Sequence, residues 1–124
     1  MNFKPLLVLL VVLLSGCSFV PSFWDDNESR AATDLRYSIA KLDCTKDQAP
    51  QIKILKDNIG WFSLYMDSKK TSDVQKMIAP MILTVDDFYK RSLEKQGGKV
   101  YCENKKAILS KQSKIVADAV MRRF

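Results

Sequence analysis

The sequence predicts an all-α protein: a small up-down bundle of four helices with one disulfide, following a cleaved signal peptide. Apolar residues recur every three or four positions through most of the chain, and no segment shows the alternation of a strand. The 124 residues suffice for one domain. A hydrophobic content of 47%, with only four glycines and four prolines, excludes a disordered or collagen-like chain.

The first sixteen residues have the features of a signal peptide. A short segment with one positive charge, Lys4, precedes nine consecutive apolar residues from Leu6 to Leu14. Because a membrane-spanning helix needs about 20 apolar residues, nine favour the core of a signal peptide over a span. The alternatives are an ordinary signal peptide without lipid and a short buried strand.

The apolar run ends in LSGC, from Leu14 to Cys17, which resembles the lipobox of bacterial lipoproteins. The resemblance implies cleavage after residue 16, and a diacylglycerol and an acylated amine on Cys17. Three acyl chains would anchor the protein stably, since each buried methylene contributes about 0.8 kcal/mol. In that family, an Asp directly after the lipidated Cys tends to retain the lipoprotein in the inner membrane. Here this position is Ser18, so the resemblance implies the outer membrane of a Gram-negative cell.

The chain therefore divides into a signal peptide over 1–16, a lipidated tether over 17–26 and a helical bundle over 27–124. The tether reaches at most about 33 Å and keeps the bundle near the bilayer. Its aromatic residues suit the headgroup zone of a membrane, although Trp24 could instead pack beneath the bundle.

The first helix is expected over 27–42. Asp25 and Glu28 have the spacing of a capping box, in which two residues three apart satisfy the free amides of a first turn. The apolar residues that follow lie on one helical face. They are Ala32, Leu35, Ile39 and Leu42.

The second helix is expected over 47–67. Thr45 and Gln48 again have capping-box spacing. Gly60 suggests a close approach to a neighbouring helix, and Trp61 is expected to pack and not to form a binding platform. The apolar positions repeat at intervals of three and four. They are Ile52, Leu55, Ile59, Phe62 and Met66.

The third helix is expected to run from Ser72, spaced for capping with Gln75, to about residue 96, and the fourth over 102–122. Apolar periodicity continues across Pro80, which favours one kinked helix over two separate helices. Two consecutive glycines at 97 and 98 are expected to end the third helix.

Cys44 and Cys102 remain after Cys17 is assigned to the lipid. Outside the cytoplasm two thiols tend to pair, and this bridge would span 58 positions. The alternatives are two separate buried thiols or, less favoured without any His, a metal site. An up-down bundle independently places both cysteines at the end far from the tether, which agrees with the bridge.

The other end of the bundle is expected to be basic. It would hold the Lys69–Lys70 loop and the C-terminal residues Arg122 and Arg123. These charges are expected to face the membrane, where anionic lipids attract cations. The alternative is ordinary solvation and charge complementation of helix ends.

Charge is distributed unevenly along the chain. Residues 88–124 have ten Lys or Arg and three Asp or Glu, whereas residues 25–87 have nine and eleven. In a cytosolic protein the basic tail would suggest nucleic acid, but the export signal removes that partner. Lipid headgroups, lipopolysaccharide phosphates or an acidic protein remain, and the alternative is a solubilising face.

The residues give little support for an enzyme. The chain has no His, which excludes Ser-His-Asp and Cys-His nucleophile systems and His-ligated metals. The S-x-x-K pattern of penicillin-binding enzymes occurs twice, at Ser38 and Ser92, without its companion motifs. We therefore expect no catalytic residues, metal or cofactor.

The layout of the mature chain resembles the small helical pilot lipoproteins of the type II secretion apparatus. The resemblance rests on Cys17, Cys44 and Cys102, the helix count, and Trp61 on the second helix. It implies an outer-membrane four-helix bundle that binds a helical segment of another envelope protein, but no binding residues carry over. The alternative is an exclusion, immunity or lysis-control lipoprotein of a phage or plasmid, recognised through its disulfide end.

Overall fold

The computed structural model describes residues 25–122, and this range is almost entirely helical. The helices are α2 (Asp26–Ala40), α3 (Gln48–Ser68), α4 (Ser72–Leu93) and α5 (Gly98–Met121). No strand occurs within the described range. The all-α prediction is therefore confirmed. The signal peptide, Cys17, the tether up to Trp24 and Arg123 lie outside the described residues.

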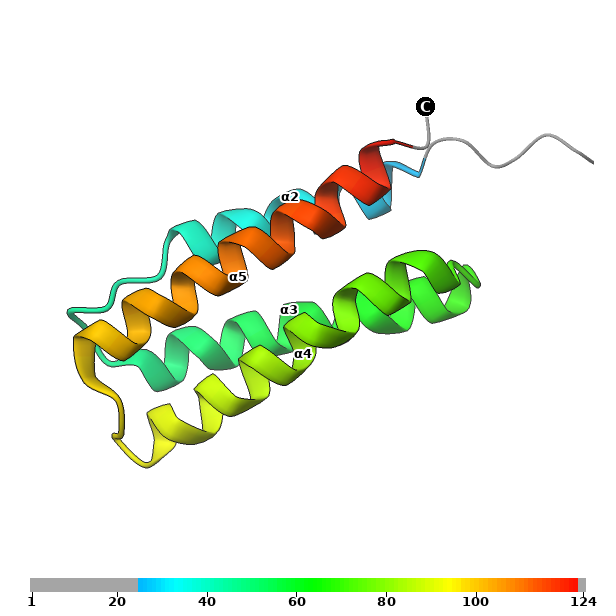
Figure 1. Cartoon of the computed structure of the whole chain (residues 1–124). Helices are drawn as coiled ribbons and strands as arrows, with labels where there is room; N and C mark the ends of the chain where they lie inside the picture. The colour runs from blue at the N-terminus through cyan, green and yellow to red at the C-terminus, as the bar shows by residue number, and fades with distance from the viewer. Residues whose placement is uncertain (1–24, 123–124) are drawn as a thin grey trace, which may run out of the picture.

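The four helices form an up-down bundle in which each helix runs antiparallel to the next (Figure 1). α4 lies between α3 and α5, and α5 returns to pack against α2. The α2–α3 and α4–α5 connections meet at one end of the bundle, which we call the disulfide end. The α3–α4 loop, the start of α2 and the end of α5 lie at the opposite end, which we call the tether end.

The core consists of the apolar faces predicted from the helical periodicity. Phe62 of α3 and Phe88 of α4 are the largest fully buried side chains. All five apolar positions expected on α3 are at most 2% exposed. Burial of such side chains is the main stabilising contribution in a helix bundle.

Two of the three predicted capping residues are wrong. Asp25 does cap α2, because its carboxylate accepts a hydrogen bond from the backbone N–H of Asn27 at 3.0 Å. α3, however, is capped by Asp47 and not by Thr45, whose hydroxyl donates to Asp43 instead. Asp47 lies directly before the first helical residue, the position from which a short carboxylate reaches the free amides.

The cap before α4 also differs from its prediction. The residue before the helix is Thr71, and Ser72 is already helical. The Thr71 side chain does not cap the helix; its hydroxyl donates to the carbonyl oxygen of Met66 at 3.2 Å. This bond closes the short loop between α3 and α4.

The α4–α5 boundary lies earlier in the chain than predicted. α4 runs through Pro80 as one helix, as expected, but ends at Leu93 and not near residue 96. Lys95 and Gly97 have φ values of 52° and 105°, which a right-handed helix cannot accommodate. α5 then begins at Gly98 and not at residue 102, so Cys102 lies one turn inside the helix.

Candidate functional site

A disulfide joins Cys44 in the α2–α3 connection to Cys102 in α5, as predicted. The two Cα atoms are 5.7 Å apart, and the bridge spans 58 positions of sequence. Cys102 is only 1% exposed, because the first turns of α5 pack over the bundle core. The bridge therefore fixes the α2–α3 connection to the start of α5.

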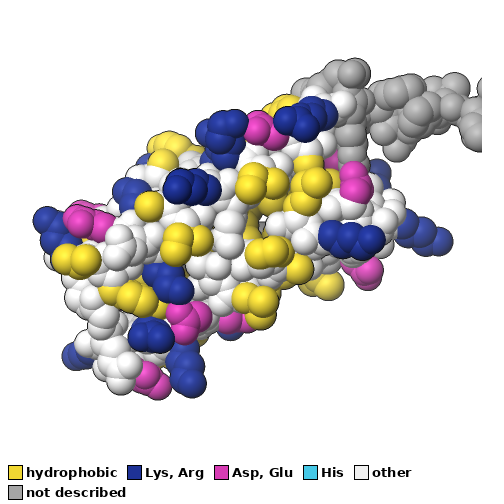
Figure 2. Space-filling model, viewed as in Figure 1, with side chains coloured by type: hydrophobic (Ala, Val, Ile, Leu, Met, Phe, Trp, Pro, Cys, Tyr) yellow, Lys and Arg dark blue, Asp and Glu magenta, His cyan; other side chains and the backbone are white. Residues whose placement is uncertain are grey.

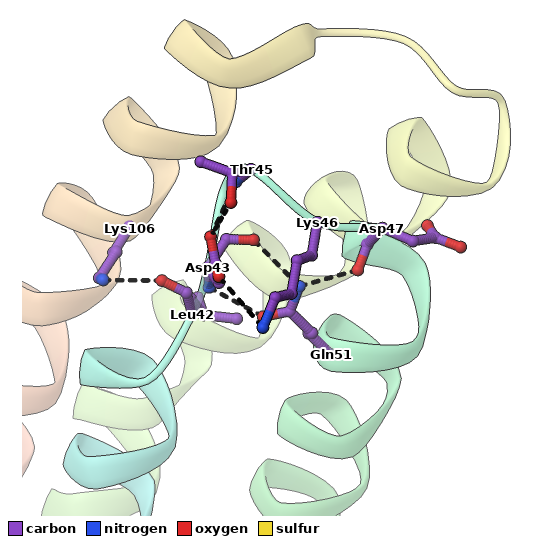
Figure 3. A network of polar contacts seen from close by, with 7 residues as sticks. All are labelled: Leu42, Asp43, Thr45, Lys46, Asp47, Gln51 and Lys106. Carbon is purple, nitrogen blue, oxygen red and sulfur yellow. Dashed lines mark hydrogen bonds and ion pairs between the residues drawn. The ribbon is translucent and has the colours of Figure 1, made fainter.

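Hydrogen bonds hold the α2–α3 connection in place beside the disulfide (Figure 3). The Gln51 side chain accepts from the Asp43 backbone N–H at 2.8 Å and donates to the Asp43 carbonyl at 3.1 Å. Bonds from the Thr45 hydroxyl and backbone N–H lower the pKa of Asp43. Lys106 of α5 donates to the Leu42 carbonyl at 2.8 Å. These polar groups are thus engaged in the loop's own structure.

At the tether end, Asp25 links the start of α2 to the end of α3. Tyr65 donates its hydroxyl to the Asp25 carboxylate at 2.6 Å, and the Lys69 ammonium lies 3.2 Å from it. Partial burial acts to raise the pKa of Asp25, but the bonds from Tyr65 and Lys69 outweigh it and leave that pKa below its usual value.

The structure brings the predicted basic residues together as far as it describes them. Lys69 and Lys70 form the α3–α4 loop, and Arg122 follows α5 at the same end of the molecule. Lys69 is engaged with Asp25, although its side chain remains 52% exposed. The shared location of these three residues is consistent with the expected basic end, whereas their orientation towards a membrane stays a prediction.

An apolar groove runs along the outside of the bundle between α3 and α4. Its volume is about 400 Å³. The α3 side of the groove comes from Ile59, Gly60 and Leu64, and the α4 side from Ile82 and Val85. Towards the disulfide end the groove is bounded by an ion pair between the two helices. This pair joins the ammonium of Lys56 to the carboxylate of Asp86 at 2.8 Å.

Gly60 contributes to this groove by the absence of a side chain. A Cβ atom added there would meet no atom within 4 Å, so the residue does not permit a close helix approach. That prediction is wrong. The Lys56–Asp86 pair joins the two helices one turn away, and the groove occupies the space beside the glycine.

Trp61 also differs from its prediction. It was expected to pack, but it is 55% exposed and stacks on Tyr65 with ring centroids 5.4 Å apart. Leu64 is 71% exposed on the same outer side of α3, and Ile54 lies two turns before Trp61. The sequence already indicated this exposure, because residues 54, 61 and 64 share a helical face that differs from the face of the core residues.

The residues considered for metal or nucleophile chemistry can be followed within the described part of the chain. No group of three or more Cys, Asp or Glu residues within 25–122 is placed to hold a metal ion. In the two S-x-x-K matches, Ser38 donates to the Asp34 carbonyl at 2.8 Å and Ser92 to the Tyr89 carbonyl at 2.7 Å. Both hydroxyls therefore bond to their own helix.

Asp87 is a carboxylate that links α4 to α5. It accepts from Lys105 at 2.7 Å and Tyr101 at 2.8 Å, both on α5, and from Arg91 at 3.3 Å on its own helix. The bonds from Lys105 and Tyr101 lower the pKa of Asp87 strongly. A carboxylate held in its charged form by three donors joins α4 to α5 and is poorly suited to proton transfer.

Comparison with protein families, curated proteins and solved structures gave no match for this chain. Among the described residues, none of the helices combines the length and the apolar character needed to cross a bilayer. The groove between α3 and α4, with the exposed apolar residues beside it, is therefore the candidate site.

Proposed function

We propose that this protein is a lipid-anchored envelope protein whose bundle is a non-enzymatic protein-binding module. Cys17 carries the lipid, the outer membrane is its location, and the bundle faces the periplasm. The partner is an envelope protein that presents a short amphipathic helix. That helix occupies the groove between α3 and α4.

The groove is the observation that carries this proposal. Its lining is largely apolar: Ile59 and Val85 line it although they are at most 2% exposed, and Ile82 is partly buried beside them. Leu64 and Trp61 extend the apolar surface onto the outside of α3. Apolar surface that stays exposed in the folded chain is a common property of docking sites, and a groove between two helices suits the apolar face of a third.

The length of the groove limits what the partner presents. Lys56 and Leu64, at its two ends, are eight residues apart on α3, which corresponds to about 12 Å at 1.5 Å per residue. That length accommodates two turns of a helix, with apolar side chains at i, i+3 or i+4, and i+7. The pocket at the disulfide end is lined largely by polar residues, including Lys46 and Gln96, and favours the groove over that end as the docking site.

The anchor orients the bundle in this proposal. The chain enters the bundle at Asp25, at the same end as the Lys69–Lys70 loop and Arg122. With Cys17 in the bilayer, this end stays within reach of anionic headgroups, which attract the exposed ammonium groups.

In-cell photo-crosslinking tests the groove. The full chain is expressed in the envelope of its own host with a photoreactive amino acid at Leu64, or at Lys41, which directly follows α2, as the exposed control. We expect one discrete adduct from position 64 and none from position 41. Replacing Gly60 by Trp, which fills the groove, should abolish the adduct. Equal adducts at both positions, or an adduct that survives the Gly60 substitution, would contradict the proposal.

The anchor has a separate test. A Cys17→Ser variant should remain unprocessed and should not incorporate labelled palmitate. The wild type should be cleaved and should incorporate the label. Normal processing and labelling of the variant would refute lipidation at Cys17 and would leave the groove proposal standing by itself.

A further inference from the structure

The outer face of α4 has a symmetric arrangement of charge that the proposed groove does not explain. Residues 77–85 carry no charge, and charged residues bound them on both sides. Asp73 and Lys90 lie eight positions to either side of the 81–82 peptide bond, and Lys76 and Asp87 lie five positions to either side. Each pair combines one acid and one base.

The uncharged centre of this face is apolar and exposed. Leu83 of α4 is 71% exposed, and Ile115 of the neighbouring helix α5 is 57% exposed. Met77 and Ile108 are exposed on the same two helices. Figure 2 shows these two helices from outside, with hydrophobic side chains gathered along the boundary between them. A hollow of about 270 Å³, lined in part by Met77 and Ile115, lies within this face.

We propose that a second copy of this chain docks on the α4–α5 face, with its α4 antiparallel to that of the first. A two-fold axis at the 81–82 bond reverses the order of residues along the partner's helix. Asp73 of each copy then lies opposite Lys90 of the other, and Lys76 lies opposite Asp87. Leu83 lies opposite Pro80, at the apolar centre.

Charge complementarity selects a second copy and not another protein. Two-fold symmetry requires a surface that is complementary to itself, so that residue i meets j and j meets i. The acid-base order along α4 is complementary to its own reverse. Neither Lys76 nor Lys90 forms an ion pair within the residues that the structure describes, and the Asp87 side chain remains 42% exposed despite its three donors. Both lysines are therefore available to the other copy.

The pairs cannot form within one chain. Asp73 and Lys90 are 17 residues apart on one helix, which is about 25 Å at 1.5 Å per residue. Lys76 and Asp87 are separated by 11 residues, or about 17 Å. Any interaction between the members of either pair is consequently an interaction between two copies.

An antiparallel dimer has one consequence for membrane attachment. The two Asp25 ends lie at opposite ends of the assembly, so both anchors reach one bilayer only when the helix axes lie along its surface. Each Lys69–Lys70 loop then stays beside the headgroups, within reach of the tether before Asp25.

The oligomeric state of the full chain in detergent tests the inference. Light scattering that separates protein from detergent mass should give twice the chain mass for the wild type. Leu83→Glu places a charge at the centre of the face and should give a single chain mass. Leu64→Glu is the matched control, because Leu64 is equally exposed but lies at the α3–α4 groove. This control should remain dimeric.

A charge swap provides the sharper test. Asp73→Lys places its new ammonium group opposite Lys90 of the other copy, and Lys90→Asp places its new carboxylate opposite Asp73. Each single variant should therefore weaken dimerisation at least tenfold at low salt. The double variant restores both pairs and should regain most of the loss. Lys53→Asp on α3 is the control and should leave dimerisation unchanged. Circular dichroism checks that each variant is folded.

Several results would overturn the inference. A monomeric wild type, a Leu83→Glu variant that stays dimeric, or a Leu64→Glu variant that dissociates would each exclude this face. A double charge variant no better than the singles would exclude the antiparallel register. None of these results bears on the crosslink at Leu64, so failure of the dimer and failure of the proposed groove are distinguishable.

Discussion

Removing the disulfide should strongly destabilise the bundle. The perturbation is the double variant Cys44→Ala/Cys102→Ala. In the chain-entropy model, a bridge that closes a loop of 58 residues stabilises the fold by about 4 kcal/mol, because it restricts the unfolded chain. Domains of this kind are stable by about 5–15 kcal/mol in total, so the loss is a large part of the stability.

Urea denaturation followed by far-UV circular dichroism measures this difference. The chemically reduced wild type serves as a second reference, because it loses the crosslink without the change in packing at Cys102, which is 1% exposed. Both should unfold at a lower urea midpoint than the oxidised wild type. Both should also show a larger m value, since an uncrosslinked unfolded chain exposes more surface.

Comparing the reduced wild type with the double variant separates the effect of the crosslink from the effect of packing at Cys102. If the reduced wild type and the double variant agree, the effect belongs to the crosslink; if only the variant is destabilised, it belongs to packing. A loss below about 1 kcal/mol in both, with an unchanged m value, would refute the entropic argument for this bridge.

Three further predictions concern single residues. Gly60→Ala should stabilise the protein by up to about 1 kcal/mol, because Ala favours a helix and the added Cβ meets no atom within 4 Å; a lower thermal midpoint would contradict this. Phe62→Ala should cost about 3–5 kcal/mol by leaving a cavity in the core, measured by urea denaturation, and a loss under 1 kcal/mol would show that Phe62 is not closely packed. Asp87 has a lowered pKa, so its contribution to stability is complete above the unfolded value of about 4 and disappears as the pH falls through the folded value. The stability difference between wild type and Asp87→Asn should therefore shrink between pH 7 and pH 2, and a difference independent of pH would exclude an ionic role.

The sequence determined the helices well, because burial on one helical face leaves a periodic record. Intervals of three and four predicted the buried face of α3 from Ile52 to Met66, and all its predicted core residues are buried. The pairing of Cys44 with Cys102 was also predictable, since the up-down order brings the two connections to one end. Both inferences depend on chain order and periodicity, which the sequence contains directly.

Helix ends were less predictable because several neighbouring residues can cap the same turn. Thr45 and Asp47 both carry short side chains with an acceptor oxygen, and the backbone of the connection decided between them. The end of α4 depended similarly on left-handed conformations at Lys95 and Gly97. These choices are decided by small energy differences between adjacent registers.

Only the tertiary structure decided the surfaces on which the two proposals rest. Periodicity places Gly60, Trp61 and Leu64 on a helix, but whether a neighbour covers them depends on the distance and orientation of α4. That geometry is set by long-range packing and by contacts such as the Lys56–Asp86 pair between residues 30 positions apart. The sequence thus determined which faces are buried in the bundle, whereas the packing of its helices decided which apolar residues remain exposed for a partner.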